Sequence, residues 1–332
     1  VVASETSSCV SSRGVYHLPL ASYDKHPSRQ LTSYDVVAPP WAYAPDVEFE
    51  AQDRHPGLLG EFVWTGFDYL GEPTPYFSGR HGARPDDPDW PARSSYFGIV
   101  DLAGFPKDRY FLYQSVWATQ PMVHVLPHWN WAGHEGRPIP VMVYTNAEEA
   151  ELWLNGRSLG RRRRGEPPVA LPVGPNVSGE GTFASRYRLL WEAPYEPGVL
   201  RAVALSGGRP VAEAQVRTAG RAAKLHVTAD RGDLRADGDD LAFVSVRVED
   251  DSGNLCPLAD NLVRFSIEGA ARLAGVDNGD PATVEPFQAS QRHAFGGLCL
   301  AIVRPDRGAA GTIRLVATSD GLQSADVVLT AR

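Results

Sequence analysis

Hydrophobic and polar positions change their spacing along the chain, and this change divides it into three regions. In the first region, short apolar runs at 1–5 and 60–64 flank a segment with helical spacing at 46–54. The order strand, loop, helix, strand is typical of β/α structure, in which a helix crosses between parallel strands. We therefore predict a parallel β/α arrangement for this part of the chain.

A second helix is predicted over 105–117. Pro106 stands near its first turn, where a missing N–H costs nothing. Tyr110, Tyr113 and Trp117 follow at i, i+3 and i+7, so they share one helical face. We expect this aromatic stripe to face the core.

Residues 121–220 switch to short alternating segments, which favour β-strands. Asn155-Gly156 between two such segments is a strong signal for a tight hairpin. The pattern predicts a small β-sandwich. Its expected strands are 139–145, 150–154, 186–191, 198–205 and 211–218.

Residues 221–332 repeat this style with new strands. Turn signals such as Asp251-Ser-Gly253 and Asp320-Gly321 separate some of them. The number of strands is typical of an immunoglobulin-like β-sandwich, although the Cys…Trp…Cys signature of antibody domains is missing. The expected strands are 225–229, 242–248, 263–268, 298–302, 312–318 and 324–330.

Composition and charge exclude several classes of partner. The apolar fraction is 43%, and no window approaches the ~20 apolar residues of a membrane helix. A net charge of −8 argues against nucleic acid or an anionic membrane as a partner. The one basic run, Arg161 to Arg164, follows a predicted turn, and we interpret it as a solvated loop.

The cysteines and the first residue add little about function. Cys9, Cys256 and Cys299 form no CxxC pair, so a zinc knuckle is not expected. A Cys256–Cys299 bridge and two buried free thiols are both open. The chain starts at Val1 on an apolar strand, which indicates an internal starting point. Periplasmic and cytoplasmic locations therefore both stay open.

Three histidines stand near two tryptophans and could suggest a metal site or a sugar platform. His124, His128 and His134 lie beside Trp129 and Trp131. Spacings of four and six fit no common zinc motif, and a proline and a glycine interrupt the stretch. We interpret the segment as the edge of an interdomain linker and predict no metal.

The most informative run is 61–76, Glu-Phe-Val-Trp-Thr-Gly-Phe-Asp-Tyr-Leu-Gly-Glu-Pro-Thr-Pro-Tyr. An apolar strand leads into a loop that is rich in aromatics and carboxylates. Aromatic rings can stack on the C–H faces of a sugar, while carboxylates accept hydrogen bonds from its hydroxyls. The alternative is a core strand followed by an ordinary Gly/Pro turn.

Three strings together resemble glycoside hydrolase family 2. They lie at 3–16, 61–76 and 94–110, in that order. The resemblance is to the β-galactosidase subgroup with extra C-terminal β-sandwich domains. It implies a mixed fold: the C-terminal strands and helices of a (β/α)8 TIM barrel over 1–120, a β-sandwich over 121–220 and an immunoglobulin-like β-sandwich over 221–332.

The resemblance also implies roles for particular residues. Glu5 matches the catalytic nucleophile at the tip of the seventh barrel strand, and Trp64 matches the aromatic floor of the sugar subsite at the tip of the eighth. Asp68 and Glu72 follow Trp64 and are candidates for binding hydroxyls. The long insertion after the seventh strand supplies further candidates for lining the cleft, namely Tyr34, Asp35 and Trp41.

The implied activity is that of a retaining exo-β-glycosidase that hydrolyses terminal β-galactosides or a related glycoside. No cofactor is implied, and the complete enzyme could be a homo-oligomer. The family's acid/base is a Glu that follows Asn, but no Asn-Glu dipeptide occurs in the chain. We therefore expect these residues to be inactive alone. Two alternatives are carbohydrate-binding or spacer modules over 121–332, suggested by Trp129 and Trp131, and a weaker one, an adhesion-type β-sandwich.

Overall fold

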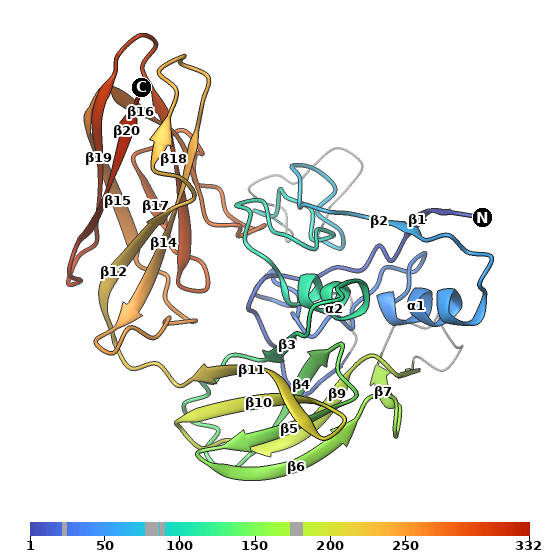
Figure 1. Ribbon diagram of the computed structural model, residues 1–332. Helices are drawn as coiled ribbons and strands as arrows, with labels where there is room; N and C mark the ends of the chain where they lie inside the picture. The colour runs from blue at the N-terminus through green and yellow to red at the C-terminus, as the bar shows by residue number, and fades with distance from the viewer. Residues whose placement is uncertain (22–24, 77–85, 87–89, 173–181) are drawn as a thin grey trace. The chain divides into compact units, whose positions relative to one another are not determined.

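The computed structural model describes residues 1–21, 25–76, 86, 90–172 and 182–332. The chain divides into two compact units (Figure 1). The first contains Val1–Thr218 with Pro281–Thr283, and the second contains Ala219–Asp280 and Val284–Arg332.

The described part of residues 1–120 contains one pair of parallel strands and two helices. Strand β1 (Ala3–Thr6) pairs with β2 (Glu61–Val63), with Ala3 opposite Glu61 and Thr6 opposite Val63. Helix α1 (Pro45–Arg54) lies between them in sequence. It starts with proline and carries acidic side chains in its first turn, where the helix dipole favours them. The predicted order of strand, helix and parallel strand is present.

Helix α2 (Asp108–Trp117) begins three residues later than predicted. The prediction that its aromatic stripe faces the core is wrong in part. Tyr113 is buried, but Tyr110 is 37% exposed and Trp117 51% exposed. The buried face is completed by Asp108, Arg109, Leu112 and Ser115. Ion pairs to distant segments decide which side of this helix faces inward, and local spacing does not report them.

A β-sandwich follows in the first unit, as its alternating pattern predicts. One sheet has the order β11-β10-β5-β6, a second has the order β3-β4-β9, and β7 and β8 pair as a two-stranded antiparallel sheet. The strands are β3 (Val123–Leu126), β4 (Pro138–Thr145), β5 (Glu149–Leu154), β6 (Arg157–Arg163), β7 (Val169–Pro172), β8 (Thr182–Ser185), β9 (Leu189–Pro194), β10 (Val199–Ser206) and β11 (Arg209–Arg217).

The predicted Asn-Gly hairpin joins β5 to β6. Asn155 and Gly156 both have positive φ, at 50° and 80°, as a tight hairpin turn requires. The basic run lies differently from its prediction, because Arg161 to Arg163 belong to β6 and not to a loop. These three side chains are nevertheless exposed.

The second unit is also a sandwich, built from two sheets around one core. The sheet orders are β12-β14-β18-β16 and β13-β20-β19-β15-β17. The strands are β12 (Ala222–Ala229), β13 (Asp233–Leu234), β14 (Ala242–Asp250), β15 (Leu262–Gly269), β16 (Ala271–Asp277), β17 (Gln291–His293), β18 (Leu298–Pro305), β19 (Gly311–Thr318) and β20 (Ala325–Ala331). Cys256 and Cys299 are free buried thiols, so the possible bridge between them is not formed.

The β-sandwich part of the predicted fold is therefore confirmed, while the barrel part stays a prediction. In the described part of the chain, no helix is long and apolar enough to span a bilayer.

Candidate active site

The parallel pair places Glu5 and Trp64 at the same end of two neighbouring strands. Glu5 is the penultimate residue of β1, and Trp64 directly follows β2. The N–H of Trp64 donates a hydrogen bond to the carbonyl of Thr6 at 3.0 Å. In parallel β/α structure, the carboxyl ends of the strands carry the functional groups.

Glu5 is exposed, and the residue after it is anchored. Thr6 is buried, and its hydroxyl donates a hydrogen bond to the Glu61 carboxylate at the start of β2. Partial burial raises the pKa of that Glu61 carboxyl. The contact fixes the end of β1 against β2 and leaves the Glu5 carboxylate open to solvent.

Trp64 belongs to a small aromatic and acidic cluster. Its indole is 38% exposed and meets the Tyr69 ring edge to face, with centroids 6.0 Å apart. The Tyr69 hydroxyl donates to the exposed Glu72 carboxylate, and burial together with this hydrogen bond raises the pKa of Tyr69 to about 12. Tyr69 was not singled out from the sequence, although its position three residues before Glu72 in a turn is a usable signal.

Asp68 is buried, unlike Trp64 and Glu72, and only 3% of it is exposed. Its Oδ2 is 2.6 Å from the Lys107 Nζ, and its Oδ1 accepts the Gly98 N–H at 2.8 Å. Burial raises the pKa of Asp68 and lowers the pKa of Lys107, while each charge opposes the shift of the other. The buried Asp68 side chain therefore anchors the loop after β2 to Lys107 and Gly98.

Gly98 approaches this loop so closely that only glycine fits. A Cβ there would lie 2.2 Å from the Asp68 nitrogen and 2.5 Å from the Phe67 carbonyl carbon. Both are backbone atoms that cannot rotate away. The close packing holds the segment that carries Trp64 and Tyr69 in one place.

The three candidates from the insertion after β1 separate into two buried residues and one exposed residue. Tyr34 and Asp35 are fully buried, whereas Trp41 is 64% exposed. The Tyr34 hydroxyl donates to the Pro140 carbonyl at 2.6 Å. Tyr34 and Asp35 are thus core residues, and we do not retain them as sugar contacts.

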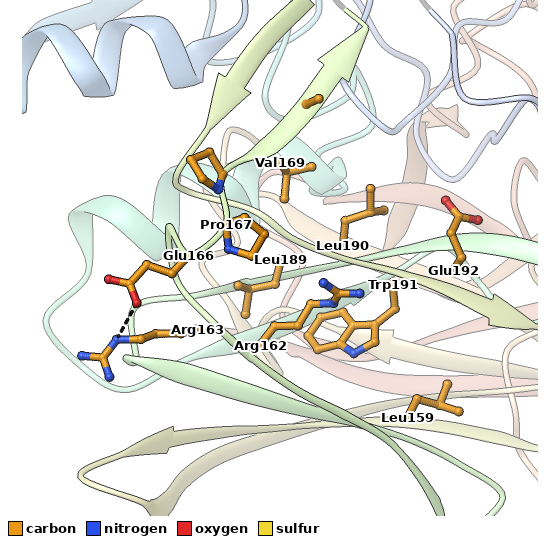
Figure 2. Close-up of a pocket in the computed structure, with 12 residues that line it drawn as sticks. Leu159, Arg162, Arg163, Glu166, Pro167, Val169, Leu189, Leu190, Trp191 and Glu192 are labelled. Carbon is orange, nitrogen blue, oxygen red and sulfur yellow. Dashed lines mark ion pairs between the residues drawn. The ribbon is translucent and has the colours of Figure 1, made fainter.

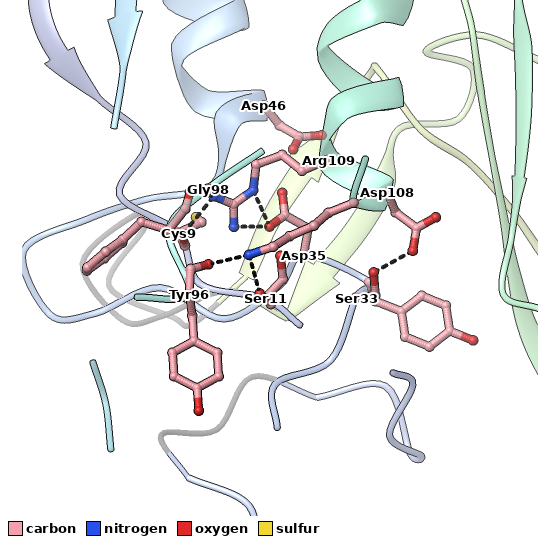
Figure 3. A network of polar contacts seen from close by, with 12 residues as sticks. Cys9, Ser11, Ser33, Asp35, Asp46, Tyr96, Gly98, Asp108 and Arg109 are labelled. Carbon is pink, nitrogen blue, oxygen red and sulfur yellow. Dashed lines mark hydrogen bonds and ion pairs between the residues drawn. The ribbon is translucent and has the colours of Figure 1, made fainter. Parts of the chain in front are cut away.

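Asp35 belongs to a network of buried charges (Figure 3). Arg109 of α2 donates to Asp35 from its Nε at 2.7 Å, and its Nη1 donates to the carbonyls of Cys9 and Phe97. Figure 3 shows Arg109 between Asp35 and Cys9. A buried guanidinium needs such a full set of acceptors. It connects α2 to the segments that follow β1.

Arg188 is a second buried arginine, and its polar contacts connect α1 to the sandwich. Its Nε lies 2.9 Å from the Oδ1 of Asp46, in the first turn of α1, and a second nitrogen reaches the other carboxylate oxygen at 2.5 Å. Arg188 also donates to the Tyr34 carbonyl at 2.7 Å, and Ser185 donates to Asp46. Both charged residues are fully buried. The sandwich is therefore joined to the β/α segment by ionic contacts as well as apolar packing.

The histidine-rich segment makes structural contacts. The His124 Nε2 lies 2.7 Å from the Asp108 Oδ1, and the His124 ring stacks on Phe111 at 3.9 Å. Burial lowers the pKa of His128 to about 4. Across residues 1–332 apart from the gaps noted above, no group of three or more His, Cys, Asp or Glu could hold a metal ion.

The tryptophans of that segment do not form an exposed platform. Trp129 is fully buried and donates from its indole nitrogen to the Glu196 carbonyl at 2.9 Å. Trp131 is partly buried, packs on the same core and donates to the His128 carbonyl. The observation that suggested a carbohydrate-binding module is therefore wrong for Trp129.

A hollow of about 490 Å³ in the first sandwich lies outside the predicted site (Figure 2). Leucine, valine and proline side chains form its walls, with Arg162 over the Trp191 ring and an ion pair between Arg163 and Glu166. None of the predicted site residues lines it.

Two family models match the sandwich regions. Residues 225–328 match glycoside hydrolase family 2 C-terminal domain 5. Residues 136–212 match a domain of unknown function, DUF4982.

Similar proteins extend these matches to the whole chain. The β-galactosidase BoGH2A of Bacteroides ovatus is 40% identical over 99% of this chain, which covers 36% of that relative. A putative β-glucuronidase of Formosa agariphila is 35% identical over 70% of this chain and 20% of its own length. A solved β-glycosidase from Bacteroides vulgatus has a TM-score of 0.81 at 29% identity, covering 99% of this chain and 41% of that one.

The chain thus spans about a third of the length of the first of these curated relatives. The family model of the second unit, the similarity along nearly the whole chain and the shared fold agree with one another. The chain belongs to glycoside hydrolase family 2, and it corresponds to a C-terminal portion of that family's members.

Proposed function

We propose that this chain supplies the nucleophile wall of the active site in a retaining exo-β-glycosidase, with residues 1–120 as the last part of a (β/α)8 barrel. The parallel pairing of β1 and β2 carries the proposal, because it brings Glu5 and Trp64 to the same end of two neighbouring strands. The pair is short and isolated, as two strands of a larger closed sheet would be. Exposed apolar side chains around it, such as Leu59 and Phe62, also support a missing neighbour.

In this proposal Glu5 attacks the anomeric carbon and forms a glycosyl-enzyme intermediate, which water then hydrolyses. A second carboxyl about 5–5.5 Å away first protonates the leaving oxygen and then activates the water. That group comes from outside these residues, since the Asn-Glu pair of the family does not occur here. Trp64 forms the floor under the sugar ring, while Glu72 and Trp41 bind at its rim.

We propose a terminal β-galactoside as the substrate. The relative of highest identity among those compared above carries the name β-galactosidase, and the competing name is β-glucuronidase. The two sugars differ at C6, which carries a hydroxymethyl group in galactose and a carboxylate in glucuronic acid, and in the configuration of the C4 hydroxyl. Comparing kcat/KM for aryl β-galactoside and aryl β-glucuronide in the full-length protein decides between them, and a higher value for the glucuronide would reject galactose.

Trapping of the covalent intermediate tests the role of Glu5. The full-length protein that contains these residues is incubated with an activated 2-deoxy-2-fluoro-β-galactoside, and its peptides are analysed by mass spectrometry. We expect the label on the peptide that contains Glu5, and a loss of turnover of at least about 10³-fold in Glu5→Gln. Glu213→Gln, at an exposed ion pair of β11, is the matched control. A label on another carboxylate, or near-wild-type turnover of Glu5→Gln, would refute the assignment.

A further inference from the structure

A second hollow lies in the second unit, far along the chain from Glu5 and Trp64. It is open, measures about 780 Å³ and lies at the β16 edge of the sheet β12-β14-β18-β16, which Figure 1 labels. Its described lining is Arg272, Leu273 and Ala274 of β16, Gln288, Ala289 and Ser290 before β17, and Arg304 of β18. Both charged residues of this lining are arginines.

The two arginines are direct partners across the sheet. Arg272 lies opposite Arg304 in the antiparallel register of β16 and β18. Side chains of opposite residues lie on the same face with Cβ atoms about 4.5–5.5 Å apart, and like charges there destabilise the pair. The sequence thus places two cations where a sheet would ordinarily hold opposite charges or a neutral pair.

Among the described residues, a carboxylate neutralises only one of these two arginines, Arg272. The Arg272 Nη1 is 3.0 Å from the Asp306 Oδ1, in an ion pair whose side chains are 55% and 49% exposed. Arg304 makes no hydrogen bond or ion pair within the described residues, and its Nε is closed to solvent without an acceptor. A buried donor without an acceptor is costly, and more so when it is charged.

The rest of the lining suits a ligand that accepts hydrogen bonds. Gln288 and Ser290 are exposed and offer an amide and a hydroxyl at the same hollow. Among the described lining residues there is no carboxylate that would repel an anion. Two guanidinium groups side by side match the oxygens of a sulfate, a phosphate or a carboxylate.

We propose that this hollow binds an oxyanion between Arg272 and Arg304, and that the oxyanion is the sulfate ester or carboxylate of an acidic glycan. The bound oxygens would accept from the terminal Nη groups of Arg304 and cancel the repulsion between the two cations. A free inorganic anion has the same chemistry, so the experiment separates the two sources. The choice of a glycan rests on the proposed glycosidase function, whereas anion binding does not depend on it and can be measured without catalysis.

Isothermal titration of the complete chain at constant ionic strength tests the proposal. The probes are inorganic sulfate, galactose 6-sulfate, galacturonate and neutral galactose. We expect the anions to bind with dissociation constants in the millimolar range and galactose to give no heat. Tighter binding of galactose 6-sulfate than of inorganic sulfate identifies a glycan ligand, whereas equal affinity contradicts the glycan and leaves a free-anion site.

Variants locate the binding. Arg304→Gln and Arg272→Gln should each weaken sulfate binding at least tenfold. Arg304→Lys, which keeps the charge but loses the fork, should fall between Arg304→Gln and the unchanged protein. Arg314→Gln is the matched control, because Arg314 is a half-exposed arginine of the same unit already paired with Asp326. Circular dichroism checks folding, and Arg272→Gln serves if Arg304→Gln does not fold. Unchanged binding in both glutamine variants, or no heat with any anion, would overturn the proposal.

Discussion

At the scale of single residues, buried charges determine how the segments of the first unit are held together. Arg188 and Asp46 are both fully buried, and three hydrogen bonds join their side chains. Removing one member of such a pair leaves an uncompensated charge in the interior, which costs far more than the intact pair contributes.

Arg188→Met tests this role. We expect it to lower the free energy of unfolding by about 3–5 kcal/mol, because Asp46 would keep only the Ser185 hydroxyl as a side-chain donor. Arg157→Met is the control, since its pair with Glu196 is largely exposed and should contribute about 0–1 kcal/mol. Urea denaturation measures both variants. Equal losses in the two would contradict the assignment.

The sequence could not reveal these pairs. Asp46 and Arg188 stand 142 positions apart, and Asp35 and Arg109 stand 74 apart. The resemblance places Asp35 in the insertion after the seventh barrel strand and so made it a candidate for lining the cleft, because the sequence of such an insertion does not show whether a carboxylate faces a sugar or an arginine. Glu5 and Trp64 were predicted from the family resemblance of the strings that contain them, to which their places at strand ends add only a weak local signal.

At the scale of elements, strands were easier to predict than helix faces. Strand β5 alternates between partly and fully buried residues, so its period of two is visible in the sequence. The hairpin turn at Asn155-Gly156 follows from the conformations those residues allow. The buried face of helix α2 was predicted incorrectly in part, because the helix buries Arg109 and Asp108, which a count of apolar positions assigns to solvent.

The connection between β3 and β4 should make stability depend on pH. Burial lowers the pKa of His128 to about 4, from an unperturbed value near 6.5. The unfolded chain therefore binds a proton more readily, and stability is lost as the pH falls from about 6.5 towards 4. We expect His128→Gln to reduce this loss by about 2 kcal/mol.

Chemical denaturation at pH 6.5 and at pH 4.5 measures that difference. His55→Gln is the control, because His55 is exposed at the end of α1. The same pH dependence in His128→Gln and in the unchanged chain would refute the role of His128.

At the scale of the whole molecule, the apolar surface is concentrated around the short parallel pair. Leu59 is 81% exposed, Phe62 68%, Phe67 61% and Leu70 61%. An open pair of strands with such neighbours favours association, since both unpaired edges and apolar area can be covered by another chain.

We expect the isolated chain to self-associate with rising concentration in sedimentation velocity experiments. Phe62→Lys should weaken this association at least tenfold, because it places a charge within the apolar surface. Leu258→Lys, at a 67% exposed position of the second unit, should leave it unchanged. A chain that stays monomeric at all concentrations would show that this apolar surface does not mediate self-association.

The ionic contact between Arg188 and Asp46 also limits where natural recombination or protein engineering can exchange modules. A junction near residue 120 looks suitable from composition, yet it would separate α1 and its carboxylate from the arginine that neutralises it. A transplanted sandwich without an equivalent of Arg188 would leave the buried Asp46 carboxylate without its cation, and the β/α segment would lose stability. Chimeras should therefore be cut after Thr218, where the continuous part of the first compact unit ends.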